Sequence, residues 1–558
     1  MKIKGAELVV EALIDQGVTE FFGYPGGTVL DIYDAIYQRQ DRIHHILTSH
    51  EQHACHAADG YARATGKVGV VLATSGPGAT NLVTGIATAM LDSIPMVAIT
   101  GNVGTPMVGK DSFQEVDITG ITLPITKHNY FVSDVNDLEH VIRQAFKIAK
   151  SDRPGPVLID IPKDVQNALV DFVPKGPSKR YDLIEPSETR IAEAAALINK
   201  ASKPYIYVGG GVMAAEAYED VLKLADKIDA VIGCSLMGIS AVPTDHPRFL
   251  GMEGMHGHYA SSIAQDECDC IIAVGTRFSD RATGNTKKFA TEASIIHMDV
   301  DFAEISKNVP AEVGVRGDLR LSLPALINAV DETKHDEWQE RVATLRAEEA
   351  AIEESLKVDY LTPKQIMEAI NEIKKPETPV ATDVGQHQMW AAQYLNFSKP
   401  RTFASSGGLG TMGYGMGAAM GCATGSKEPT VLITGDGSFG MNLNEIGTAV
   451  ANKMPLTIVI LNNHVLGMVR QWQTLFYGER YSNTVLDQKA VDYIKLAEAF
   501  GAEGVTVTTE AEFKDAFEKA YNSGKVTLID ARINRDDFVL PMLPPGGAVS
   551  DMITKKGE

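Results

Sequence analysis

The sequence predicts three consecutive α/β domains, each a doubly wound parallel sheet with helices on both faces. A chain of 558 residues is too long for a single hydrophobic core. Apolar segments that end in glycine or small polar residues alternate with helical patterns along the whole chain, which is typical of α/β folds. We expect domains at residues 1–165, 189–340 and 361–540, a linker at 166–188, and a loosely ordered or lid-like tail at 541–558.

The first domain is predicted from the apolar strands KVGVVLATSGPGATN, DSIPMVAITGN and GPVLIDIPKDV. A further strand, HHILTSH, precedes the helix EQHACHAADGYARATG, which Glu51 opens. An acid in the first turn of a helix is favourable for the helix dipole, so a structural role is the default for Glu51. His44 and His45 lie within the preceding strand, and we interpret them as structural.

The second and third domains repeat this pattern. In the second, the strand signals are PYIYVGGGV, AVIGCSLMG, CIIAVGTRF and SIIHMDVD, followed by the charged helix DEWQERVATLRAEEAAIEESL. In the third, they are TPVATDVG, PTVLITGDG, LTIVILNN and VTLIDARI. The first and third domains have similar lengths and the same strand-to-glycine-loop style, as a duplication would leave.

Composition excludes several classes of protein. A formal charge of −21, without a basic tract, argues against nucleic acid and anionic membrane surfaces as partners. The N-terminal segment MKIKGAELVVEALIDQG is interrupted by Glu7, Glu11 and Asp15, so it lacks the apolar core of a secretion signal. No apolar run reaches membrane-spanning length, and five cysteines argue against a disulfide framework. We therefore expect a cytoplasmic protein.

The most informative segment runs from Gly435-Asp436-Gly437 to Asn462-Asn463. Each group follows a predicted strand, and ligands of parallel sheets collect beyond the carboxyl ends of strands. A carboxylate and an amide at this edge are oxygen ligands suited to Mg²⁺ that holds a diphosphate. A lone GDG is most simply a tight turn, but the paired spacing favours a ligand site.

This pair resembles the diphosphate anchor of thiamine diphosphate (ThDP) enzymes, whose three domains are doubly wound. The resemblance implies that Asp436, Asn463 and a backbone carbonyl near Val465 bind Mg²⁺. Residues 54–63, ACHAADGYAR, resemble the helix that follows the catalytic glutamate of that superfamily. Glu51 is then expected to hydrogen-bond the aminopyrimidine of the cofactor and to promote removal of the thiazolium proton, a role that needs a tuned pKa.

Other motifs occur in the order found in these enzymes. Met412 matches the bulky apolar residue that supports the bent cofactor, although core packing is the alternative for a methionine. The loop TSGPGATN is expected to pack about the pyrimidine ring. The further residues that the resemblance assigns to ThDP are Pro25, Gly26 and Gly27 in the first domain and Gly385, Gln386, His387, Gly410, Gly437, Ser438 and Gly467 in the third.

The segment NNHVLGMVRQWQTLFYGERY resembles the catalytic subunit of acetohydroxyacid (acetolactate) synthases. In that family the tryptophan that matches Trp472 crowds the site and favours 2-oxobutyrate as the second substrate, with Met468 nearby. A core pair of Met468 and Trp472 is the alternative. The loop GKDSFQEVDITG resembles the segment that delivers Phe113 and Gln114 to substrate, and PKDV places Lys163 by the same channel, unless it is a surface lysine.

The second domain resembles the FAD-binding domain of the same family. A lone glycine triplet such as Gly209–Gly211 is a weak nucleotide signal. GMEGMHGHYA, VGTRFSDRATGN and HMDVD complete the match. The resemblance assigns to FAD the residues Arg153, Gly209, Gly210, His256, Arg277, Asp299 and Asp318.

The resemblance covers residues 3 to 545 and implies an acetohydroxyacid synthase. Pyruvate would be decarboxylated and joined to pyruvate or 2-oxobutyrate, the first common step toward valine, leucine and isoleucine. It also implies a homodimer or tetramer with active sites between subunits, and a separate small regulatory subunit. The alternatives are a pyruvate oxidase that reduces FAD, another carboligase, and a non-catalytic paralogue.

Overall fold

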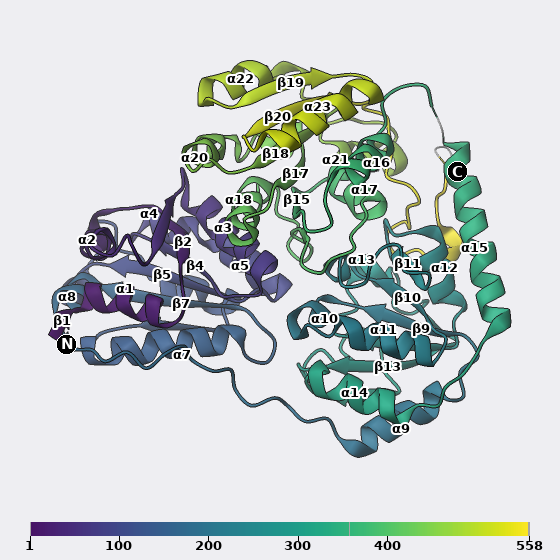
Figure 1. Cartoon of the computed structure of the whole chain (residues 1–558), viewed down its shortest axis with the longest axis horizontal. Helices are drawn as coiled ribbons and strands as arrows, with labels where there is room; N and C mark the ends of the chain where they lie inside the picture. The colour runs from purple at the N-terminus through teal and green to yellow at the C-terminus, as the bar shows by residue number, and fades with distance from the viewer. Residues whose placement is uncertain (1, 357, 556–558) are drawn as a thin grey trace.

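The computed structural model describes residues 2–356 and 358–555 and contains three six-stranded sheets and one two-stranded sheet. Each six-stranded sheet belongs to a separate region of the chain, as the sequence predicts. Figure 1 shows the first region in purple and blue, the central region in teal, and the third in green and yellow above it. The third region contacts both of the others, so a site at the interfaces between regions can include residues of all three.

The first sheet is wholly parallel, with order β3-β2-β4-β5-β7-β6. Its strands are β2 (Glu20–Gly23), β3 (His44–Leu47), β4 (Gly69–Ala73), β5 (Met96–Asn102), β6 (His128–Phe131) and β7 (Pro156–Pro162). Its helices are α1 (Gly5–Asp15), α2 (Leu30–Tyr37), α3 (Glu51–Thr65), α4 (Pro77–Asn81), α5 (Val83–Asp92), α6 (Ile118–Thr122), α7 (Leu138–Lys150) and α8 (Lys163–Asn167). Glu51 is the first residue of α3, as predicted.

The central sheet has the order β11-β10-β9-β12-β13-β14 and is also parallel. Numbered by appearance, this is 3-2-1-4-5-6, the order of dinucleotide-binding domains. Its strands are β9 (Pro204–Val208), β10 (Val231–Cys234), β11 (Phe249–Met252), β12 (Cys270–Val274), β13 (Ser294–Asp299) and β14 (Val313–Arg316). Its helices are α9 (Glu188–Ile198), α10 (Gly210–Ala215), α11 (Tyr218–Lys227), α12 (Tyr259–Glu267), α13 (Asp280–Thr283), α14 (Leu319–Ala329) and α15 (Asp336–Ser355).

The third sheet has the order β16-β15-β17-β18-β20-β19. Numbered by appearance, the first and third sheets share the order 2-1-3-4-6-5, which agrees with a duplication. The strands are β15 (Val380–Thr382), β16 (Phe403–Ala404), β17 (Thr430–Gly435), β18 (Leu456–Asn462), β19 (Glu503–Val507) and β20 (Thr527–Arg532). The helices are α16 (Pro363–Ile373), α17 (Gln386–Tyr394), α18 (Gly415–Ser426), α19 (Asp436–Phe439), α20 (Ile446–Ala451), α21 (Gly467–Phe476), α22 (Tyr493–Phe500) and α23 (Glu510–Ser523).

Helices α3 and α18 join the first and third regions by close packing of small residues. A Cβ on Gly60 would lie 2.2 Å from the carbonyl oxygen of Ala418, and one on Gly421 would lie 1.9 Å from that of Ala57. Neither position has room for a side chain. The two backbones approach because both helices carry glycine and alanine at their contact, which fixes α3 against the third region (Figure 1).

Two predicted connecting segments are more ordered than expected. The predicted linker contains β8 (Leu169–Asp171), which pairs antiparallel with β1 (Lys2–Lys4). In the tail, Met542 and Leu543 are buried, and the Leu543 N–H donates to the carbonyl of Met255 in the central region. Apolar side chains in these Pro- and Gly-rich stretches gain burial by folding back. The start of the tail is therefore held against the central region, and residues 556–558 lie outside the described residues.

No helix within residues 2–356 and 358–555 combines the length and the hydrophobicity needed to cross a bilayer.

Candidate active site

Asp436 and Asn463 follow neighbouring strands of the third sheet. Strand β17 ends at Gly435, which pairs with Leu461 of β18, so both polar residues emerge at one edge. Burial raises the pKa of the Asp436 carboxyl to about 7, although nearby backbone N–H groups, including those of Gly437 and Asn463, act against this shift. A carboxylate and an amide at this edge form an oxygen donor set that fits Mg²⁺.

The residues predicted to face a diphosphate contact one another around this edge. Gln386 Nε2 donates to Gln471 Oε1 at 2.9 Å, and Asn463 Nδ2 donates to Gln386 Oε1 at 3.5 Å. His387 is buried, and its Nε2 has no hydrogen-bond partner among the described residues. Burial lowers the pKa of His387 to about 4, against the charge of Asp383. This ring nitrogen can donate a hydrogen bond to a diphosphate oxygen in the tautomer in which Nε2 carries the proton.

The loop that carries Met412 is held from the third sheet. Asp383 Oδ1 accepts hydrogen bonds from the N–H groups of Gly413 and Tyr414, at 2.9 Å and 3.1 Å. Gly413 N also lies 3.3 Å from Ser438 Oγ, beside the GDG turn. Gly410 has φ of +68°, a conformation that favours glycine. Met412 is thus fixed between the GDG turn and a cavity that it lines.

A cavity of about 1600 Å³ lies where the three regions meet. Its lining brings together residues that the sequence assigned to different ligands. From the third region come Gly385, Gly410, Met412, Met468 and Trp472; from the first and central regions come Arg153, Gly210, His256, Arg277, Asp299 and Asp318. Gly209 is not among the lining residues, and a Cβ there would lie 2.1 Å from the carbonyl oxygen of Gly275, so its visible role is close packing.

The side of this cavity that the sequence assigns to FAD is polar, and several of its charged side chains already pair with one another. Asp318 caps helix α14 and binds the Arg320 guanidinium, and Arg153 Nη1 lies 2.7 Å from Glu304 Oε1. Burial lowers the pKa of His256 to about 3, and its Nδ1 has no partner among the described residues. The cavity size, the glycines at the end of β9 and this unpaired nitrogen fit a dinucleotide cofactor, although Asp318 is already engaged.

Glu253 is a cavity residue that the sequence analysis did not single out. It is buried, and its Oε2 accepts a hydrogen bond from the Tyr205 hydroxyl at 3.0 Å. Burial raises the pKa of Glu253 to about 8, so its carboxyl is protonated at neutral pH. A glutamate inside the otherwise apolar or small-residue motif GMEGMHG was the signal in the sequence.

The first region gathers a second group of predicted residues. Loops 25–29 and 74–81 lie against each other, with Thr28 Oγ1 3.0 Å from Thr74 Oγ1. Glu51 Oε2 accepts a 2.9 Å hydrogen bond from Asn81 Nδ2. Lys163 Nζ donates to the Gly27 carbonyl at 3.0 Å, so its ammonium sits at the same loops although the residue is exposed.

The Phe113–Gln114 loop packs on this group as well. A Cβ on Gly76 would lie 2.8 Å from the Gln114 carbonyl oxygen, and Phe113 is 87% exposed. Pro25, Gly26, Glu51 and Gln114 do not line the large cavity in the described part of the chain. The structure therefore forms one group around Glu51 and another around Asp436 and Asn463, and none of these three residues is among the described residues that line the cavity.

Comparison with known proteins agrees with this architecture. The chain matches the thiamine pyrophosphate enzyme N-terminal TPP binding domain at residues 3–121, the central domain at 191–326 and the C-terminal TPP binding domain at 383–531. The fold and the site thus define a thiamine diphosphate enzyme.

Full-length relatives narrow this class. The chain is 45% identical to the acetolactate synthase isozyme 2 large subunit of Escherichia coli (strain K12), over 99% of this chain and 100% of that protein. It is also 45% identical to the acetolactate synthase large subunit of Parasynechococcus marenigrum (strain WH8102), over 99% of this chain and 91% of that one. The chain belongs to the acetolactate synthase large-subunit family.

Proposed function

We propose that this chain condenses two 2-oxoacids with loss of CO₂. Two pyruvates give 2-acetolactate, and pyruvate with 2-oxobutyrate gives 2-aceto-2-hydroxybutyrate, the first common step toward the branched-chain amino acids. The observation that carries this proposal is the cavity in which Gly385 and Met412 lie beside Met468 and Trp472. One wall suits a thiamine cofactor and the neighbouring one suits a second substrate.

The chain's own residues have distinct tasks in this reaction. When bound, thiamine diphosphate supplies the electron sink for decarboxylation and carbon–carbon bond formation. Asp436, Asn463 and the Val465 carbonyl would hold Mg²⁺ and, through it, the diphosphate. Glu51 would exchange a proton at its carboxyl oxygen with the pyrimidine, while Asn81 orients that carboxyl. FAD would occupy the central-region side of the cavity without net redox turnover.

The acceptor would be chosen by large side chains near the cavity mouth. The Trp472 ring lies 5.6 Å from that of Phe476, in an edge-to-face arrangement, and 5.9 Å from the Arg281 guanidinium carbon. These contacts restrict the indole, so it narrows the space for the second 2-oxoacid. Phe113, Gln114 and Lys163 would complete that channel from a second copy of the chain.

The direct test is incubation with pyruvate and 2-oxobutyrate in the presence of ThDP, Mg²⁺ and FAD, followed by identification of the products. Acetolactate and acetohydroxybutyrate are expected. Steady reduction of the flavin, with acetate or acetyl phosphate as product, would instead identify an oxidase. Omission of each cofactor in turn shows which of them the reaction needs.

We also propose that the active site forms between two copies of the chain. The Glu51 group lies apart from Met412 and the cavity, which supports a second copy of the chain as the source of Glu51 for the cofactor. Glu51→Gln and Asp436→Asn variants should each be inactive, whereas a reassociated mixture should regain about a quarter of wild-type activity, because half of random dimers carry one intact site. A mixture that stays inactive, although hybrids form, would show that each chain builds its own site.

One further partner and a cellular location follow from the same assignment. The relatives are named as large subunits, which supports a separate small regulatory subunit for this chain. All five cysteines are free and buried, which fits the cytoplasmic location expected from the sequence. Co-purification of a tagged chain from its source organism is the measurement that checks the small subunit.

A further inference from the structure

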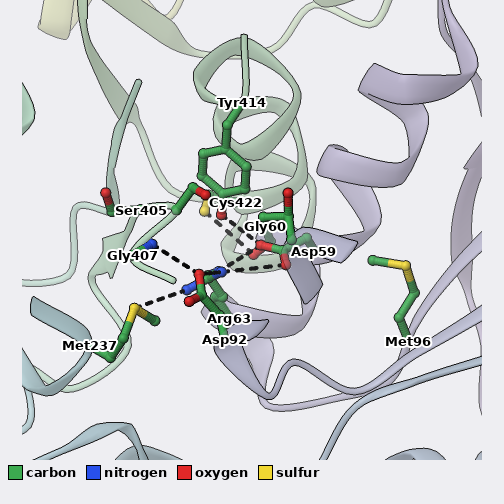
Figure 2. Close-up of polar contacts among 12 residues, drawn as sticks. Asp59, Gly60, Arg63, Asp92, Met96, Met237, Ser405, Gly407, Tyr414 and Cys422 are labelled. Carbon is green, nitrogen blue, oxygen red and sulfur yellow. Dashed lines mark hydrogen bonds and ion pairs between the residues drawn. The ribbon is translucent and has the colours of Figure 1, made fainter. Parts of the chain in front are cut away.

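A buried charged cluster joins helix α3 to the loop that carries Met412. We define this Arg63 cluster as Asp59, Arg63, Asp92 and Tyr414 (Figure 2). Arg63 Nε lies 2.6 Å from Asp59 Oδ1, and Arg63 Nη2 lies 2.8 Å from Asp92 Oδ2. The Tyr414 hydroxyl donates to Asp59 Oδ1 at 2.6 Å. One guanidinium therefore serves two carboxylates, and all three charged groups are at least nine-tenths buried.

Asp92 continues this cluster into the cavity wall. Its Oδ2 accepts from the Gly407 N–H at 3.0 Å, and its Oδ1 accepts from the Gly408 N–H at 2.7 Å. Figure 2 shows dashed lines that join the Asp92 carboxylate to the Gly407 nitrogen and to the Arg63 guanidinium. Asp92 ends α5 and also lines the cavity, so a first-region carboxylate holds two consecutive amides of a third-region loop.

The anchored loop has little freedom elsewhere. A Cβ on Gly407 would lie 2.5 Å from Met237 Sδ, and one on Gly408 would lie 2.9 Å from Asp92 Oδ1 and 3.2 Å from Arg277 Nη2. Further along, Thr411 Oγ1 lies 2.8 Å from Thr88 Oγ1 of helix α5. Residues 407–411, which immediately precede Met412, are thus held by α5 on one side and by Met237 and Arg277 of the central region on the other.

We propose that Asp92, itself fixed by Arg63, is a positioning residue that sets the Gly407–Met412 loop against both cofactor sites. Two buried carboxylates that share one guanidinium cost stability relative to apolar packing. We therefore assign to Asp92 the placement of the loop rather than a gain in stability. This proposal rests on the proposed ThDP function, because Met412 is the residue that the loop delivers. Neither Arg63 nor Asp59 lines the large cavity in the described residues, and both act through Asp92 and Tyr414.

The test is the full chain with Asp92→Asn, which keeps the shape but turns one acceptor into an N–H₂ facing other donors. ThDP affinity with Mg²⁺ is measured without substrate by quenching of tryptophan fluorescence, and FAD affinity by flavin fluorescence. We expect ThDP binding to weaken roughly tenfold or more and kcat to fall to a similar extent, with KM for pyruvate changed by less than about threefold. Arg63→Lys should retain more ThDP affinity than Arg63→Met.

The matched control is Glu11→Gln, which removes another buried acid from a cluster with Arg39 and Arg42, at 2.6 Å and 3.0 Å, away from the loop. It should lower the melting temperature while leaving ThDP affinity unchanged. Equal loss of ThDP affinity in Glu11→Gln and Asp92→Asn, or an Asp92→Asn affinity within about twofold of wild type, would overturn the proposal.

A second variant covers the case in which Asp92→Asn does not fold. Gly408→Ala leaves every charge in place and pushes the loop away from Asp92 and from the Leu91 Cβ, 2.9 Å from the added carbon. Gly408→Ala should weaken ThDP binding, as Asp92→Asn does, and unchanged binding would overturn the proposal. If wild-type protein binds no ThDP, the proposed function fails instead, so the two failures are distinguishable.

Discussion

Asn81 Nδ2 donates a 2.9 Å hydrogen bond to Glu51 Oε2 and thereby joins the start of helix α3 to the end of helix α4. The two residues come from separate segments of the first region that the fold places side by side. Among the described residues no hydrogen bond is seen to the other oxygen of the Glu51 carboxyl, and a Cβ on Gly78 would lie 3.2 Å from that oxygen. The missing side chain at Gly78 leaves the space through which a pyrimidine ring could reach the carboxyl.

Replacing Glu51 with glutamine should abolish most of the activity while cofactor binding persists. The amide keeps the size of the side chain but cannot exchange a proton with the pyrimidine, so kcat should fall about a hundredfold or more. Turnover and ThDP binding are measured on the same preparation. A Glu51→Gln enzyme with near-normal turnover would show that another group moves the proton.

Replacing Trp472 with leucine should lower the preference for 2-oxobutyrate over pyruvate. The smaller side chain widens the acceptor space, and an extra methylene in an apolar pocket contributes about 1–3 kcal/mol to discrimination. The ratio of the two products in mixed-substrate assays measures this preference. Phe476→Leu should lower the preference less than Trp472→Leu, because Phe476 packs on Trp472 but is not among the described residues that line the cavity. An unchanged ratio in Trp472→Leu would remove the tryptophan from acceptor choice.

Loss of the Asp436 carboxylate should remove the dependence of ThDP affinity on Mg²⁺. Asp436→Asn removes the charged ligand, so ThDP affinity in the presence of Mg²⁺ should drop by about a hundredfold, close to the level reached by chelating the metal from wild type. Both affinities are obtained by titration. His464→Ala is the control, because the His464 imidazole is engaged by Arg532. A His464 variant that also lost Mg²⁺ dependence would contradict the assigned ligands.

The buried Glu253 carboxyl should make the protein less stable as the pH rises. Its pKa is about 8 in the folded chain against 4.5 as the ordinary value, so between these pH values the folded state binds a proton that the unfolded chain has released. The free energy of unfolding therefore falls as pH rises through this window, by at most about 1.4 kcal/mol per pH unit from this group. Glu253→Gln should flatten the dependence.

Urea unfolding of wild type and Glu253→Gln at several pH values from 5 to 8 measures this slope. Glu292→Gln, which changes an exposed glutamate of the same region, should leave the slope as in wild type. An identical slope in the Glu253 variant would mean that Glu253 is ionised in the folded state.

Much of the fold was predictable because its strands and turns are encoded in short contiguous segments. VLITGDG contains an apolar strand, a glycine turn and a helix start in seven residues, and β17 and α19 meet at Gly435 and Asp436. The linker and the tail were predicted less well from the sequence. Their proline and glycine content signals irregular backbone, but it does not show that β8 pairs with β1 or that Met542 is buried.

The sequence by itself determined the three α/β regions, the paired placement of Asp436 and Asn463, and the position of Glu51 at a helix start. Each of these depends on residues close together in the chain, where backbone geometry follows local pattern. Only the tertiary structure decided which groups share a cavity, that Glu51 lies outside it, and that Asp92 holds the amides of Gly407 and Gly408, 315 and 316 residues away. Such contacts depend on how the regions pack, because a buried carboxylate needs partners that the local sequence does not supply.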